Sequence, residues 1–165
     1  MYQETIEKCA AVAARIKNTS ANNPLSFWIG SLMAGAYVGL GIILIFTLGN
    51  LVDPAIRPLV MGATFGIALT LVIIAGAELY TGHTMFLTFG VKTGKLNSTQ
   101  AVGILAQSWT GNLLGSIVVA YLFYLGGGGQ ILPVDGSLVH KVALAKTAAP
   151  ALALFAKGML CNWLV

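Results

Sequence analysis

The stretch AGAELYTGHT, residues 75–84, decides the fold because it places polar and flexible residues between two apolar segments. The preceding segment, Leu59 to Ala77, is about one membrane length, and the following one, Met85 to Val91, is too short to cross. Non-helical backbone is tolerated at membrane depth only where protein buries it or a wet cavity borders it. Periodicity leaves two structures open. One is a helix broken in two by an inserted loop that lines a cavity, and the other is an ordinary helix ending at Ala77 with a re-entrant or surface loop after it.

Lipid is the natural solvent for this chain. Its 165 residues are 57% hydrophobic and 8% charged, whereas a soluble domain carries about 25% charged residues. A water-soluble fold of this length cannot cover its surface with so few charges. The net charge of +4 does not indicate nucleic-acid binding, because the bases lie mostly at the ends of apolar runs, where lysine and arginine set membrane topology. We therefore expect an all-α integral membrane protein.

Apolar runs divide the chain into spans, each needing about 20 residues. They are Pro24–Leu48, Leu59–Ala77 and 99–125, and a fourth run begins near Ala148 and is still apolar at Val165. A polar loop is expected from the glycines at 126–129 through about Lys146. No arginine, glycine or polar cap closes the last run. The sequence thus predicts a transmembrane domain over 24–165, truncated within its fourth span, and a natural protein of three and a half spans is the alternative.

Residues 1–18 form a separate, more charged segment. Its apolar residues recur at helical spacing, which predicts an amphipathic helix lying on a membrane or a partner: Ile6, Ala10, Ala13 and Ile16. Asn22-Asn23-Pro24 predicts an N-cap and a first-turn proline for the first span. Five bases on one side of the membrane face three on the other, which places the N-terminus in the cytoplasm by the positive-inside rule: Lys8, Arg15, Lys17, Lys92 and Lys95 against Arg57, Lys141 and Lys146.

Three polar residues in the interrupted stretch are candidates for function. Glu78 is an ionisable group at membrane depth, where such groups are costly. Its carboxylate could accept hydrogen bonds from backbone amides that the break frees, a structural role, or could transfer protons. His83 could be a proton relay or a satisfied structural residue. The Thr81 hydroxyl could donate to an anion or cap its own loop backbone.

Other polar residues lie near the fourth run. Lys146 could attract anions by its local potential or snorkel at the interface. Lys157 could face a wet cavity or a subunit interface, which the sequence does not decide. Asn162 could donate to a permeating anion or cross-link two helices. Cys9 and Cys161 lack metal-ligand spacing, so neither a metal nor a cofactor is expected.

Together these motifs resemble the formate–nitrite transporter family, and are closest to its nitrite-channel branch, over the whole chain. The features are the amphipathic helix followed by Asn23-Pro24-Leu25, the stretch 75–82, Leu144-Ala145-Lys146 with Pro150 behind it, and the segment from Lys157-Gly158 to Cys161-Asn162-Trp163-Leu164-Val165. The Thr-Gly-His-Thr sequence at 81–84 favours the nitrite branch. Tyr80 departs from many formate channels, which have phenylalanine there.

The resemblance implies an aquaporin-like bundle of six spans, with the second and fifth broken, in a homopentamer of the bacterial inner membrane with one pore per subunit. This chain would hold about three and a half of those spans. The matching positions imply a pore constriction at Phe65, Leu69, Leu79 and Tyr80, a loop threonine at Thr81 that bonds the family's pore histidine, a vestibule lysine at Lys146 and a pore asparagine at Asn162. That histidine belongs to the fifth helix, so His83 does not inherit its role.

The resemblance also implies a function without catalysis. We expect a channel that passes nitrite with protons, the neutral acid crossing the constriction. A formate, lactate or hydrosulfide channel is the alternative within transport. The alternative from another class is a membrane anchor subunit of a redox enzyme, which needs paired histidines for haem, and this chain has only His83 and His140. A scaffolding membrane protein would leave the interrupted span and Glu78 unexplained.

Overall fold

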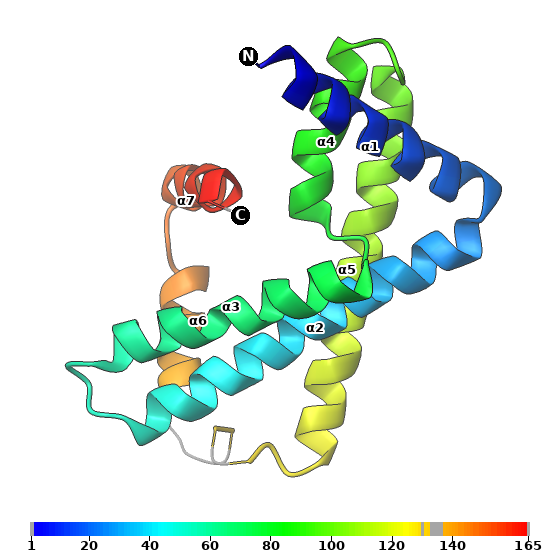
Figure 1. The fold of residues 1–165 in the computed structure, drawn as a ribbon. Coiled ribbons are helices and arrows are strands. Elements are labelled where there is room, and N and C mark those ends of the chain that lie inside the picture. The colour runs from blue at the N-terminus through cyan, green and yellow to red at the C-terminus, as the bar shows by residue number, and fades with distance from the viewer. Residues whose placement is uncertain (1, 130, 133–136, 165) are drawn as a thin grey trace.

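The computed structural model describes residues 2–129, 131–132 and 137–164, and its regular elements in these ranges are all α-helices. The predicted all-α class is confirmed. The seven helices described are α1 (Gln3–Asn22), α2 (Pro24–Leu51), α3 (Arg57–Ala75), α4 (Tyr80–Lys92), α5 (Ser98–Leu125), α6 (Leu138–Thr147) and α7 (Ala151–Leu164). Figure 1 shows α2 and α3 running side by side and α4 lying along α5. Helix α1 crosses the C-terminal end of α4 and the N-terminal end of α5.

Within the described residues, three helices are long and apolar enough to cross a membrane: α2, α3 and α5, with 28, 19 and 28 residues. These are the three predicted spans. Asn23 caps α2 as expected, since its side chain accepts a hydrogen bond from the Ser26 amide at 3.4 Å and Pro24 occupies the first turn. Among the described residues, α6 and residues 151–161 together make a fourth candidate span, and the two parts are bent by 113°.

Glycines let α2 approach its neighbours backbone to backbone. A side chain at Gly35 would collide with the backbone carbonyl of Asn112 on α5, and one at Gly115 would collide with the carbonyl of Leu32 on α2. On the opposite side of α2, a Cβ atom at Gly41 would lie 2.7 Å from the Cβ of Ala68 on α3. Helices in lipid associate through such close contacts of small residues, because lipid tails offer no hydrophobic driving force between them. The central helix α2 is therefore locked between α3 and α5.

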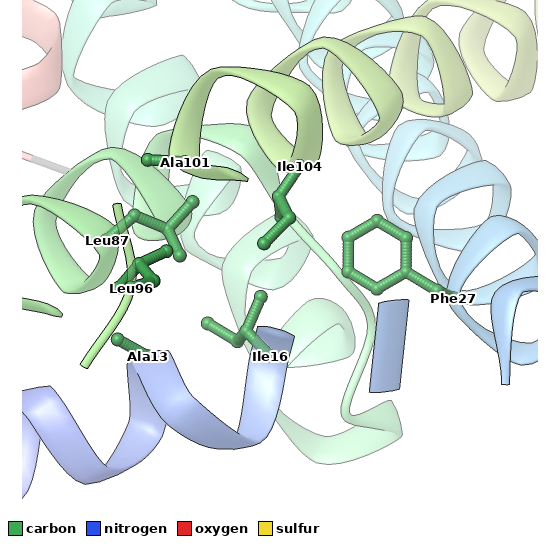
Figure 2. Packing of buried hydrophobic residues seen from close by; sticks show 7 residues of the cluster. All are labelled: Ala13, Ile16, Phe27, Leu87, Leu96, Ala101 and Ile104. Atoms are coloured by element: carbon green, nitrogen blue, oxygen red, sulfur yellow. The ribbon is translucent and has the colours of Figure 1, made fainter. Parts of the chain in front are cut away.

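The N-terminal helix packs on the chain itself. Ala10, Ala13 and Ile16, from the predicted apolar face, are buried, and the helix continues past residue 18 to Asn22. Figure 2 shows the cluster that this face joins, made of Ala13, Ile16, Phe27, Leu87, Leu96, Ala101 and Ile104. The cluster ties α1 to α2, α4 and α5, so the partner of this helix, which the sequence left undefined, is the rest of the chain.

The expected polar loop before the fourth run is partly wrong. Its residues 130 and 133–136 lie outside the described part of the structure, but Leu138–Thr147 forms α6. The sequence pattern did not reveal this short helix, because its ten residues give a weak periodic pattern. Helix α6 ends before Pro150, which has no backbone N–H to continue a helix, and α7 begins at Ala151.

The glycine contact between α2 and α5 makes a stability prediction. We expect Gly35→Ala to lower the free energy of unfolding by about 1–3 kcal/mol, because the added methyl group must displace the backbone of Asn112. Gly103→Ala is the matched control on α5, since no atom lies within 4 Å of its added Cβ. Denaturation in detergent would measure both variants. A Gly35→Ala protein as stable as Gly103→Ala would contradict the close packing.

Candidate functional site at the break between two helices

The interrupted span is two helices joined by four residues, as the broken-helix interpretation predicted. The first helix, α3, ends at Ala75, and Gly76 adopts the left-handed conformation with φ of 64°. The Gly76 amide donates to the Ile73 carbonyl at 3.2 Å and the Ala77 amide donates to the Val72 carbonyl at 2.9 Å. This pair of bonds is a Schellman motif, which closes a helix end with a glycine. The second helix, α4, then begins at Tyr80.

The loop backbone is held by the two neighbouring spans. The Glu78 amide donates to the Gly30 carbonyl of α2 at 3.1 Å. The Tyr80 amide donates to Asn112 Oδ1 of α5 at 2.9 Å. The Glu78 carbonyl accepts from Asn112 Nδ2 at 3.0 Å and from Ser108 Oγ at 3.3 Å. The Glu78 and Tyr80 amides and the Glu78 carbonyl are thus paired with the neighbouring spans.

The break contacts its two neighbours at different points along their lengths. Asn112 lies in the middle of the 28-residue α5, whereas Gly30 is the seventh residue of the 28-residue α2. Ala75 and Gly76 are exposed in the described chain, and residues 77–80 are half-buried. Non-helical backbone at membrane depth requires protein or a wet cavity around it, and the hydrogen bonds to α2 and α5 supply protein contacts on one side of this loop.

The side chain of Glu78 contacts a different group from the one expected. Its Oε2 lies 2.8 Å from His83 Nε2, and the two side chains are 22% and 6% exposed. The His83 ring also stacks on Phe27 of α2, with ring centroids 5.7 Å apart and planes at 25°. We expected the carboxylate to accept from free loop amides, but the amides of Glu78 and Tyr80 donate to Gly30 and Asn112 instead. The expectation failed because those partners come from distant parts of the chain.

The two ring nitrogens of His83 have different surroundings. Nε2 faces the Glu78 carboxylate, whereas Nδ1 is buried without a partner among the described residues. His83 is thus joined to Glu78 across the first turn of α4.

The predicted constriction residues form two groups. Phe65 and Leu69 lie four residues apart on one face of α3, whereas Leu79 is the last residue of the loop and Tyr80 is the first residue of α4. All four are half-buried. Tyr80 lines an open cleft of about 590 Å³ against α5, where Trp109 is a neighbour. The loop connects the two groups, so apolar side chains lie on both sides of the break.

Thr81 presents a hydroxyl without a partner. Its Oγ1 is buried and makes no hydrogen bond to the described residues. The Thr81 backbone carbonyl instead accepts from the Thr84 hydroxyl at 2.6 Å. The alternative in which Thr81 caps its own loop backbone is therefore not what the structure shows. A buried hydroxyl costs about 1–3 kcal/mol when unpaired, so this group is available to a ligand or to another protein segment.

The remaining candidates lie elsewhere. Lys146 is exposed in the last turn of α6. The start of α6 lies near Gly49 at the C-terminal end of α2, whereas the break contacts Gly30 near the other end of that helix. Lys157 is exposed on α7, and the side chain of Asn162 lies outside the described part of the structure. The structure does not bring Lys146 or Lys157 to the break, and the expected role of Asn162 stays a prediction.

Three residues that hold the break escaped sequence analysis: Ser108 and Asn112, which act through their side chains, and Ser31, which acts through its backbone carbonyl. Asn112 was recognisable in principle, because a polar amide in the middle of an apolar span is expensive unless it is paired. Its partner was not, because Glu78 lies 34 residues away along the chain. The two serines resemble the small residues that fill any helix contact, so nothing in the sequence marked them.

Comparison with known proteins gives concordant matches. A family model described as formate/nitrite transporter matches residues 3–165. The nitrite transporter NirC of Escherichia coli (strain K12) is 72% identical over the whole chain, which covers 61% of that protein. The formate channel BtFdhC of Bacillus thuringiensis is 32% identical over 93% of the chain and 60% of that protein. A solved structure named FNT family ion channel is 72% identical with a TM-score of 0.94, over 98% of this chain and 65% of that one. The chain thus spans less than two thirds of each of these relatives.

The Glu78–His83 contact predicts a difference between two substitutions. We expect Glu78→Ala to lower the free energy of unfolding by about 1–3 kcal/mol, because it leaves His83 Nε2 buried without a partner. Glu78→Gln keeps an acceptor and should lose less. The control is Glu4→Gln, which breaks an exposed pair with Lys8 worth about 0.3–0.5 kcal/mol. Thermal unfolding of the three variants tests this order, and equal losses for Glu78→Ala and Glu4→Gln would refute it.

Proposed function

The chain belongs to the formate/nitrite transporter family, and from this premise we propose that the protein is a channel for a small monovalent weak-acid anion, with nitrite as the preferred one. The choice of nitrite rests on identity, 72% to the E. coli nitrite transporter against 32% to the B. thuringiensis formate channel. We further propose a bacterial inner-membrane protein with a cytoplasmic N-terminus, assembled as a homopentamer. Its activity is transport and not catalysis.

One observation carries this proposal more than any other. Leu79, Tyr80 and Thr81 follow the break in direct succession, and the backbone on both sides of Leu79 is bonded to the middle of α5. Two bulky apolar side chains therefore stand next to a buried hydroxyl that has no partner in the described chain. A narrow apolar passage with one polar contact suits a small solute that sheds its water and its charge.

The mechanism follows from the cost of desolvation. An anion that enters an apolar constriction without water meets a large free-energy penalty, but a weak acid avoids it by taking up a proton. In this scheme the positive potential of Lys146 raises the anion concentration at the pore mouth. The anion is protonated before or within the constriction, and the neutral acid passes Phe65, Leu69, Leu79 and Tyr80. Thr81 and Asn162 supply hydrogen bonds along the passage.

Other functions fit less well. Formate, lactate or hydrosulfide would meet the same constriction, so these anions remain competitors in the same assay. The redox-anchor alternative requires two histidines on one haem. Here His83 is bonded to Glu78 on α4, whereas His140 is exposed on α6 with its Nδ1 2.8 Å from Ser137 Oγ. Each histidine has its own local partner, which favours transport.

The role of Lys146 predicts a loss that depends on substrate concentration. In proteoliposomes with the full-length protein, we expect Lys146→Ala to lower nitrite flux about tenfold at low nitrite and much less at saturation, because local potential acts on anion concentration. Lys141→Ala, which changes another exposed lysine of the same helix, is the control. Flux should also rise as the pH falls, because more acid is neutral. A nitrite flux that is the same in Lys146→Ala as in the wild type, and the same at all pH values, would contradict this mechanism.

The buried hydroxyl of Thr81 makes a separate prediction. Thr81→Val keeps the side-chain volume and removes the hydroxyl, so we expect at least a tenfold loss of flux without a fall in unfolding temperature, since no described residue bonds that oxygen. Thr81→Ser keeps the hydroxyl and should retain most of the flux. Wild-type flux through the valine variant would exclude a role for this group in passage.

A further inference from the structure

Asn112 joins three elements around the break. Its Oδ1 accepts from the Tyr80 amide at the start of α4. Its Nδ2 donates to the Ser31 carbonyl of α2 at 2.8 Å and to the Glu78 carbonyl of the loop at 3.0 Å. A primary amide has two N–H donors and one carbonyl acceptor, and here both donors and the acceptor are used. Asn112 is thus fully paired and links α5 to α2, the loop and α4.

Two of these bonds enclose a single residue. The Glu78 carbonyl and the Tyr80 amide belong to the two peptide groups that flank Leu79. Asn112 therefore grips the backbone on both sides of Leu79, which has extended dihedrals of φ −88° and ψ 127°. Extended backbone at a helix start is stable only while its polar groups stay paired. These two hydrogen bonds therefore set the direction of the Leu79 side chain and of the Tyr80 side chain after it.

Asn112 itself has little freedom to move. A Cβ atom at Gly35 would lie 2.7 Å from the Asn112 Cα, so the α2 backbone lies directly against this residue. The bond to Ser31 attaches the amide to the same helix. A second anchor joins the loop to α2, since the Glu78 amide donates to the Gly30 carbonyl. The hydrogen bonds around Leu79 therefore start from a residue that is closely packed between α5 and α2.

We propose that Asn112 is a positioning residue of the pore, which fixes the positions of Leu79 and Tyr80 and thereby limits the size of the acid that passes. This inference rests on the proposed function. Asn112 acts through these two residues and does not touch the solute. The other donor to the Glu78 carbonyl, Ser108, bonds at 3.3 Å and reaches only one side of Leu79. Removal of the Ser108 hydroxyl therefore leaves both hydrogen bonds of Asn112 around Leu79 intact.

The test is a selectivity ratio in the full-length protein reconstituted in liposomes. Asn112→Asp keeps the size and the acceptor for Tyr80, but it places one carboxylate oxygen, in place of Nδ2, against the carbonyls of Ser31 and Glu78 and so displaces the loop. We expect the lactate-to-nitrite flux ratio to rise at least tenfold. The matched control Ser108→Ala should stay within about twofold of the wild type. A loss of stability alone would lower both fluxes together and leave the ratio unchanged.

The outcomes separate the two proposals. An unchanged ratio in a folded, assembled Asn112→Asp protein overturns the role of Asn112 while nitrite transport stands. If that variant fails to assemble, Asn112→Ser is measured instead, because small residues are tolerated at helix contacts, and a wild-type ratio there overturns the role equally. A wild-type protein that moves neither nitrite nor lactate overturns the proposed function itself, and the inference with it.

Discussion

Backbone hydrogen bonding inside the membrane is the constraint on which this structure depends. A helix that breaks at membrane depth exposes amides and carbonyls, and each unpaired group costs several kcal/mol in hydrocarbon. At this break the amides of Gly76 and Ala77 bond back to α3, the Glu78 amide bonds to α2 and the Tyr80 amide bonds to α5. These hydrogen bonds determine the loop conformation. That conformation sets the positions of Leu79, at the end of the loop, and of Tyr80 and Thr81, at the start of α4.

Close packing makes those pairings possible. The side chain of Asn112 is short, so it reaches the Ser31 carbonyl and the loop only because α2 and α5 touch through glycines at 35, 111 and 115. Larger residues at these positions would separate the helices and leave the loop carbonyl without its donor. The glycines therefore contribute to the site without touching it, and stability and function are linked through a single helix contact.

Local patterns predicted the local features of this fold. Gly76 and Glu78 between apolar runs indicated the break, and Asn23-Pro24 indicated the start of α2, because each depends on neighbouring residues. Contacts between distant segments were not predictable. The register of α2 against α5 decides that Asn112 meets Glu78, and His83 takes the carboxylate that we assigned to loop amides. The short α6 escaped because ten residues carry too little periodicity.

A cysteine scan of residues 72–84 in the full-length protein, with Cys9 and Cys161 first replaced by serine, tests the central claim most directly. Each variant is treated with a small water-soluble thiol reagent in lipid, with and without nitrite. The broken helix predicts that the 3.6-residue period of reactivity stops at 76–79, and that cysteines at 79–81 react and are protected by nitrite. A helical period that continues through 84, with positions 79–81 unreactive, would contradict it.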